Sequence, residues 1–305
     1  IAEKQKLLND LSKIIQFPKK IIAANGEKLP NKIVGKDILE YAKRVNELPV
    51  DNLYFKPKLH SKNAPNAKQS SAIRAPLNKN VLVLAGAGSG KTKTIVDRIK
   101  YLATKSIEPD DIRVLAYNRK AAEELSERIS INCKVTTFSA WCKRMLKAFY
   151  TDFNNLQVLA YKDELESRTA FYELLNSIML HPDNHKTFLN MNSYMVNTGC
   201  SHEDAMEYGN SRAFNGETRK FRVLCRKYKK AKDEGNYWDF DDMFSYMLEQ
   251  LNTDKEFLNY VVGSQRYLIV DEMQDSSNIQ WDILRRLADN GVKLFLVGDP
   301  AQTIY

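Results

Sequence analysis

The segment with the clearest chemistry is AGAGSGKT at residues 85–92, which directly follows four apolar residues. It fits the phosphate-loop pattern, with alanine in place of the leading glycine. Glycine lets backbone N–H groups turn toward a phosphate where a side chain would collide, and Lys91 should neutralise the β- and γ-phosphates. The residues expected to hold the nucleotide are Gly86, Ala87, Gly88, Ser89, Gly90, Lys91 and Thr92.

A second candidate group is the acid pair in YLIVDEMQD, residues 267–275. The apolar strand would deliver Asp271 to its carboxyl end, where it can hold Mg²⁺ together with the hydroxyl of Thr92. The adjacent Glu272 can orient and deprotonate an attacking water molecule. We expect Lys91 and Asp271 to meet across one magnesium–triphosphate, so the expected cofactors are ATP and Mg²⁺.

The elements that must position these groups alternate between strand and helix. Short apolar runs predict strands that are buried on both faces, and segments with helical spacing of apolar residues follow them. Such alternation favours right-handed crossover units, and therefore an α/β fold with a parallel sheet flanked by helices. The predicted strands cover residues 80–86, 112–117, 133–138, 267–272 and 293–299.

Two segments stand outside this alternation. Residues 146–257 are polar and helical, which predicts an insertion into the sheet domain. Residues 1–66 predict a small basic helical extension that ends in a linker rich in lysine and proline. Residues 1–68 carry 14 Lys and Arg against 7 Asp and Glu, within a net charge of +8 for the 305 residues. This balance suits a polyanionic partner, and it equally suits a solvated lysine-rich surface.

Apolar runs, the first residues and the spacing of cysteines indicate where in the cell we expect the protein. No apolar run approaches the roughly 18 residues of a membrane span, and the first residues lack the order of a signal peptide. None of the cysteines has zinc-site spacing, so we expect reduced thiols in an intracellular protein without a membrane partner. They are Cys133, Cys142, Cys200 and Cys225.

Three motifs, AGAGSGKT, VDEMQD and VGDPAQTIY, occur in this order along the chain. They resemble motifs I, II and III of superfamily 1 helicases of the UvrD/Rep/PcrA type. Smaller matches are KQSSAI to the Q motif, AYNRKAAEEL to motif Ia, TTFSAW to motif Ib, and DFDDM to the element before motif II. The resemblance spans about residues 66–305. It implies a RecA-like motor domain 1A at 67–145 and 258–305, with the helical insertion 146–257 as a 1B arm.

The resemblance also implies roles for single residues. Gln69 would hydrogen-bond the adenine edge with its amide. Lys93 would lie beside the nucleotide, where the family often has an arginine. Gln302 would sense the γ-phosphate and join Lys91 and Glu272 as a catalytic residue.

DNA contacts are implied for seven residues. Of these, Tyr117, Trp141 and Tyr305 lie where the family has aromatic residues that contact the strand or neighbour it, and a base stacked on such a ring contributes about 1–3 kcal/mol. The alternative for each of these three rings is a core position. The sequence departs from the family at Ser139, where motif Ib usually has histidine, and at Arg119, where motif Ia has asparagine; an arginine suits a phosphate contact. The seven residues are Tyr117, Asn118, Arg119, Thr137, Phe138, Trp141 and Tyr305.

The insertion carries a basic run that would follow a DNA backbone or form a solvated helix face. Its members are Arg219, Lys220, Arg222, Arg226, Lys227, Lys229, Lys230 and Lys232.

The activity implied by the resemblance is ATP-dependent helicase action and 3′-to-5′ translocation on single-stranded DNA, in repair, recombination or replication. The expected partners are single-stranded DNA, junctions of single strand and duplex, and a loading or nuclease partner. The alternatives are the motor of a helicase–nuclease or defence complex, a nucleotide-gated remodelling module that does not unwind, and an ATPase acting on RNA. A metabolic kinase would need neither Gln69 nor GDPAQTIY.

Members of the family also use a second motor domain with motifs IV to VI, whose arginines complete the nucleotide site. Residues 1–305 contain no match to these motifs. An arginine finger contributes about 10³–10⁵ in rate, so we expect these residues alone to bind ATP but to hydrolyse it poorly. The expected location is the cytoplasm, near the nucleoid, or the cytoplasm of a viral host.

Overall fold

The chain forms two compact units. One takes in the described residues up to Phe138 together with Val261–Ser276 and those from Leu284 on, and the other comprises Ser139–Tyr260 and Ser277–Ile283. Most of the predicted site residues belong to the first unit. The computed structural model describes residues 50–56, 65–155, 157–158, 165–178, 180–209, 214, 216–299 and 301.

The first unit is built on a six-stranded parallel sheet with the strand order β1-β2-β8-β7-β3-β4. This sheet confirms the α/β class and the strands predicted from apolar runs. Strand β8 lies between β2 and β7, the strands that precede the glycine loop and the acid pair. The strands are β1 (Val50–Lys56), β2 (Asn80–Ala85), β3 (Ile112–Ala116), β4 (Lys134–Thr137), β7 (Tyr267–Val270) and β8 (Lys293–Gly298).

The edge strand β1 differs from the sequence prediction, which made residues 1–66 a helical extension with a linker. Residues Val50–Lys56 instead pair in parallel with β2, for example Leu53 beside Leu82. An Asp–Asn pair near the start of this segment weakens the local strand signal, and pairing with β2 supplies the partners that its backbone needs. Residues 1–49 of the predicted extension lie outside the described residues.

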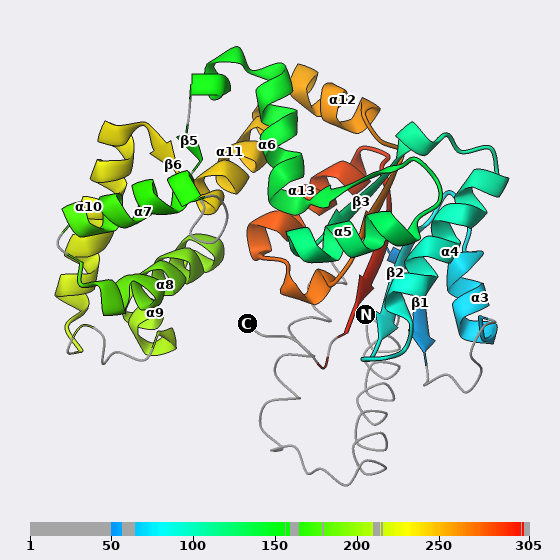
Figure 1. Ribbon diagram of the computed structural model, residues 1–305, viewed down its shortest axis with the longest axis horizontal. Helices are drawn as coiled ribbons and strands as arrows, with labels where there is room; N and C mark the ends of the chain where they lie inside the picture. Colours follow the sequence, from blue (N-terminus) through cyan, green and yellow to red (C-terminus); the bar gives the residue numbers. More distant parts are fainter. Residues whose placement is uncertain are drawn as a thin grey trace, which may run out of the picture. The chain divides into compact units, whose positions relative to one another are not determined.

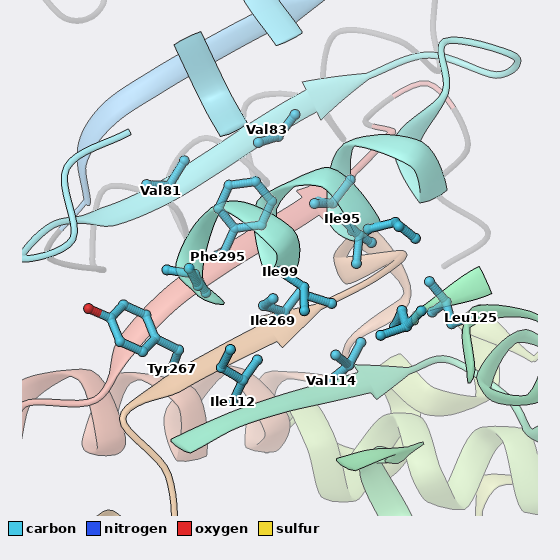
Figure 2. Packing of buried hydrophobic residues seen from close by; sticks show 14 of the residues in the cluster. Val81, Val83, Ile95, Ile99, Ile112, Val114, Leu125, Tyr267, Ile269 and Phe295 are labelled. Atoms are coloured by element: carbon cyan, nitrogen blue, oxygen red, sulfur yellow. The ribbon is translucent and has the colours of Figure 1, made fainter. Parts of the chain in front are cut away.

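Both faces of the sheet are buried. Leu82, Leu115, Leu268 and Leu296 face one side and have almost no exposed surface. Their strand neighbours face the other side, where they form one hydrophobic cluster with the helices (Figure 2). Burial on both sides explains why these strands are continuous apolar runs. The cluster includes Val81, Val83, Ile112, Val114, Tyr267, Ile269 and Phe295 from strands, and Ile95, Ile99 and Leu125 from helices.

Three helices pack side by side against this second face (Figure 1). They are α3 (Ala67–Ile73), α4 (Lys91–Thr104) and α5 (Arg119–Arg128), and the short 3₁₀ turns η1 (Pro109–Asp111) and η5 (Met273–Asp275) belong to the same unit. Helices α4 and α5 begin directly after the loops that follow β2 and β3. Their first turns therefore lie at the carboxyl edge of the sheet.

The second unit is mainly helical, with a core cluster that includes Phe171, Phe188, Met191 and Phe221. Its boundaries fall inside α6 (Phe138–Phe149), α12 (Lys255–Gly263) and α13 (Asn278–Asp289). The assignment of residues 146–257 to a 1B arm stays a prediction. The other elements are η2 (Thr151–Asn155), β5 (Gln157–Val158), α7 (Leu165–Ser177), η3 (Pro182–Asn184), α8 (His185–Thr198), α9 (His202–Tyr208), α10 (Thr218–Gly235), β6 (Tyr237–Trp238) and α11 (Phe240–Thr253).

Within the described ranges, no helix is both long enough and apolar enough to cross a bilayer. All four cysteines are free thiols.

The basic run lies on α10, but Lys232 does not belong to a solvated face. Its buried Nζ lies 2.7 Å from Oδ2 of Asp239 and 2.5 Å from Oδ2 of Asp242. Burial by itself would lower the pKa of Lys232, but the attraction of Asp239 and Asp242 raises it. The hydroxyl of Tyr228 donates to the same oxygen of Asp239 at 2.9 Å. Lys232 is therefore part of an internal ion-pair network, which corrects its place among the residues expected to follow DNA.

We predict that Lys232→Met destabilises the protein by about 3–5 kcal/mol, because it leaves buried carboxylates without their cation. The exposed Lys229, three residues earlier on the same helix, is the matched control. Lys229→Met should change the free energy of unfolding by no more than about 0.5 kcal/mol. Urea unfolding curves of the two variants measure the difference, and equal stabilities would contradict the network.

Candidate nucleotide site

The candidate site lies at the carboxyl edge of the parallel sheet. The glycine loop follows β2, the acid pair follows β7, and Asp299 follows β8, which separates the other two strands. The backbone N–H of Asp271 extends the ladder by donating to the carbonyl of Leu115 at 2.9 Å. Because all these strands are parallel, segments that are far apart in sequence converge at one edge.

The glycine loop has the backbone shape that a phosphate requires. Gly88 and Gly90 have φ angles of +66° and +78°, in the left-handed region where a side chain would be strained. Gly90 also caps α4, whose first turn contains no acidic residue. The Ser89 hydroxyl is buried and has no hydrogen-bond partner. An unpaired hydroxyl and the positive end of a helix dipole fit a phosphate group.

Lys91 connects the glycine loop to the acid pair directly. Its Nζ lies 2.6 Å from Oε2 of Glu272, and the two side chains are 11% and 30% exposed. Neighbouring strands lie about 4.8 Å apart, so the pair spans the width of β8. The structure thus brings Lys91 to the acids, as the sequence predicts, with Glu272 rather than Asp271 as the contact.

The acids around Lys91 have raised pKa values. Burial, followed by repulsion from Glu272, raises the pKa of Asp271 to about 6 and that of Asp275 to about 6. Burial also raises the pKa of Asp299. Lys91 acts in the opposite direction on all three carboxyl groups. The site therefore holds more negative charge than one lysine balances, which favours a divalent cation.

The expected magnesium ligands fit this chemistry. Among the described residues, no three His, Cys, Asp or Glu side chains form a cluster that could hold a metal without further ligands. Magnesium in nucleotide sites typically takes only one or two protein oxygens and completes its shell with phosphate and water. Asp271 at the end of β7 and Thr92 in the first turn of α4 can supply those oxygens.

Sequence analysis missed a bridge between motifs II and III. The side chain of Gln274 donates to Oε2 of Glu272 at 2.8 Å and accepts from the backbone N–H of Asp299 at 3.0 Å. The carboxylate of Asp299 in turn accepts from the backbone of Ala301 at 3.0 Å. The available signal was that Asp299 directly follows a buried strand and that Gln274 lies two residues after the acid pair.

Gln69 lies against the glycine loop, inside α3. Its Oε1 accepts from the backbone of Asn66 in a capping box, and its Nε2 makes a long contact of 3.5 Å with the carbonyl of Ser89. The buried Arg98 of α4, which sequence analysis also missed, donates to the carbonyl oxygens of Ile73 and Ala75 at 2.8 and 2.6 Å. Arg98 thereby ties the end of α3 to α4. The role of Gln69 in reading adenine stays a prediction.

Lys93 forms an ion pair with Asp97 at 2.7 Å, one turn along α4. The structure does not bring it to the acid cluster, and its predicted place beside the nucleotide stays a prediction. Gln302 and Tyr305 lie outside the described residues.

The predicted DNA contacts divide into exposed and buried groups. Tyr117, just past β3, is 46% exposed, and Arg119 is exposed at the start of α5. Asn118 caps α5 by accepting from the backbone of Ala121 at 2.9 Å. Thr137, half-buried, ends β4. These positions are compatible with single-stranded DNA that runs along the carboxyl edge of the sheet. The contacts with DNA themselves stay predictions.

Trp141 and Phe138 require a correction. Trp141 is 0% exposed and Phe138 is also buried, both on α6. A ring that stacks on a base must present an open face. In this structure both rings are therefore core positions, which was the alternative interpretation of Trp141.

A fully parallel sheet, a glycine loop that opens a helix, and an acid pair beside the loop's lysine define a phosphate-loop nucleotide-binding domain. A comparison with protein families identifies the family of this nucleotide-binding domain. The chain belongs to the UvrD/REP helicase family, whose N-terminal domain matches residues 65–305.

Individual relatives agree with this family. The chain is 29% identical over 250 residues to a probable DNA helicase II homolog of Mycoplasma capricolum, and 30% identical over 251 residues to DNA helicase II of Escherichia coli. It is 26% identical over 250 residues to the ATP-dependent DNA helicase PcrA of Staphylococcus epidermidis. Each match covers 79% of this chain and 34% of the relative. The chain therefore spans about a third of the length of these curated relatives.

We predict that Lys91→Ala weakens the binding of magnesium–ATP by at least about tenfold, because a hydrogen bond to a charged group contributes about 1.5–3 kcal/mol. The exposed Lys100 of α4 is the matched control, and Lys100→Ala should bind like the wild type. Titration of the 305-residue chain with a fluorescent ATP analogue measures both. Equal affinities, or an unfolded Lys91→Ala variant, would contradict the assigned role.

Proposed function

We propose that this chain is the ATP-binding part of an ATP-dependent DNA helicase that translocates on single-stranded DNA from 3′ to 5′. The observation that carries the proposal is the 2.6 Å contact between Lys91 and Glu272, which joins the glycine loop to the acid pair. Membership of the UvrD/REP helicase family supports DNA as the substrate. Repair, recombination or replication in an intracellular setting is the proposed context.

The residues of the site divide the work of hydrolysis. Lys91 exchanges Glu272 for the β- and γ-phosphate oxygens when ATP binds, with the N–H groups of the glycine loop around the same phosphates. Thr92 and Asp271 would hold Mg²⁺, which would neutralise charge on the phosphates. Glu272, released from Lys91, accepts a proton from the attacking water molecule.

DNA binding is proposed at the ends of β3 and β4 through Tyr117, Arg119 and Thr137. The remaining basic side chains of α10 would contact phosphates of a duplex near a junction. A second motor domain with motifs IV to VI is proposed as the partner that completes the ATP site. Without it, these 305 residues would bind ATP and hydrolyse it slowly. A loading or nuclease partner is a further proposal.

We predict that Glu272→Gln binds magnesium–ATP at least as tightly as the wild type, because Lys91 loses the carboxylate that competes with phosphate. Turnover should fall by about 10²–10⁴, the usual contribution of a general base. Steady-state ATPase rates of the full-length polypeptide, with and without single-stranded DNA, measure this. A variant that retains activity would assign the base elsewhere, and a wild type that DNA does not stimulate would contradict the proposed function.

We predict that Tyr117→Ala weakens binding of single-stranded DNA by about tenfold or more, since a stacked base contributes about 1–3 kcal/mol. Its affinity for ATP should not change, because Tyr117 lies outside the glycine loop and the acid cluster. Fluorescence anisotropy with a labelled oligonucleotide provides the measurement. The exposed Tyr172 of α7 is the control, and an equal loss in Tyr172→Ala would remove Tyr117 as a specific contact.

A further inference from the structure

Gln274 occupies an unusual position between two motifs. It lies in the 3₁₀ turn η5, directly after the acid pair, and only 8% of its surface is exposed. Its amide nitrogen donates to Oε2 of Glu272 and its amide oxygen accepts from the backbone of Asp299. The Gln274 side chain thus donates one hydrogen bond to motif II and accepts one from motif III. Among side chains of this length, only the glutamine amide has both a donor and an acceptor.

The orientation of Glu272 depends on few contacts. Its backbone is left-handed, with φ +47° and ψ +44°, which is uncommon for a residue with a side chain. Within the described part of the chain, two side chains hold its carboxylate, Lys91 at 2.6 Å and Gln274 at 2.8 Å, both on Oε2. When phosphate engages Lys91, Gln274 is the side chain that continues to hold Glu272.

The other end of Gln274 lies on the segment that leaves β8. Asp299 is the first residue of this segment, and Gln302, the predicted γ-phosphate sensor, follows three residues later. A displacement of Asp299 would move the amide of Gln274, and with it the carboxylate of Glu272. The geometry thereby couples the general base to the segment after β8.

We infer that Gln274 is a positioning residue for ATP hydrolysis: it holds Glu272 in the orientation in which it accepts a proton, and it ties that orientation to the backbone of Asp299. The inference rests on the proposed function, because it requires Glu272 to act as the base. It assigns Gln274 no contact with the nucleotide.

Two substitutions in the full-length polypeptide separate the two hydrogen bonds. Gln274→Glu keeps the size and an acceptor for Asp299, but it cannot donate to Glu272 when ionised. Gln274→Met removes both bonds. We expect kcat with saturating single-stranded DNA to fall by about 10- to 100-fold in each variant, the usual cost of losing a supporting contact. In Gln274→Met, which adds no charge, the KM for ATP should not change, because a bond that matters only for the chemical step leaves ground-state binding intact.

Gln280 provides a matched control. Its amide oxygen also accepts a backbone N–H, that of Ser277 at 2.8 Å, but it makes no contact with Glu272. Gln280→Glu should therefore keep the wild-type kcat. A Gln274→Glu variant with the kcat of the wild type would overturn the inference.

A double-substitution cycle distinguishes positioning from a purely structural role. In a Glu272→Gln background, the base is already lost, so adding Gln274→Met should not lower the residual single-turnover rate further. A full additional loss would show that Gln274 acts on the fold of the site and would overturn the inference. If the wild type itself shows no DNA-stimulated hydrolysis, the proposed function fails first, and this outcome is distinguishable from the other two.

Discussion

The convergence of β2, β8 and β7 at one edge of the parallel sheet is the constraint on which the rest of the site depends. It allows Lys91, at the start of α4, to reach Glu272 across the width of the intervening strand. A shift of β7 by one residue would reverse the faces on which its side chains lie, and the acids would then point away from the loop. Burial of the strands on both faces makes such a shift costly, because polar groups would replace apolar ones in the core.

At this edge of the sheet, carboxylates outnumber the lysine that pairs with them. Burial raises the pKa values of Asp271, Asp275 and Asp299, and a single lysine offsets part of their repulsion. A magnesium ion and a triphosphate together would supply both the positive charge that the carboxylates need and the acceptors that the glycine loop needs. The arrangement is thus suited to binding the two as one unit, and the left-handed backbone of Glu272 is a local strain of the kind found at functional sites.

Lys232 in the second unit shows how the same residue types serve a different purpose. Both lysines pair with carboxylates, but Lys232 has two partners, Asp239 and Asp242, which form the capping box of α11, and Asp239 also accepts from Tyr228. Every member of that network is committed to a neighbour, which stabilises the helical unit. Lys91 has one carboxylate partner in the described residues and opens the helix that follows a loop in which the buried Ser89 hydroxyl has no partner, so its ion pair can be exchanged for a ligand.

The sequence by itself determined the strands β2, β3, β4, β7 and β8 and the glycine loop, because burial on both faces and a left-handed loop leave local signatures in residue type. It also determined the family, through motifs that occur in a fixed order. Only the tertiary structure decided that Trp141 is a core residue, that Lys232 is internal, that β1 joins the sheet, and that Gln274 links Glu272 to Asp299. These four features depend on which segments, distant in sequence, pack against one another in the folded chain. The spacing of residues along the sequence does not specify those tertiary contacts.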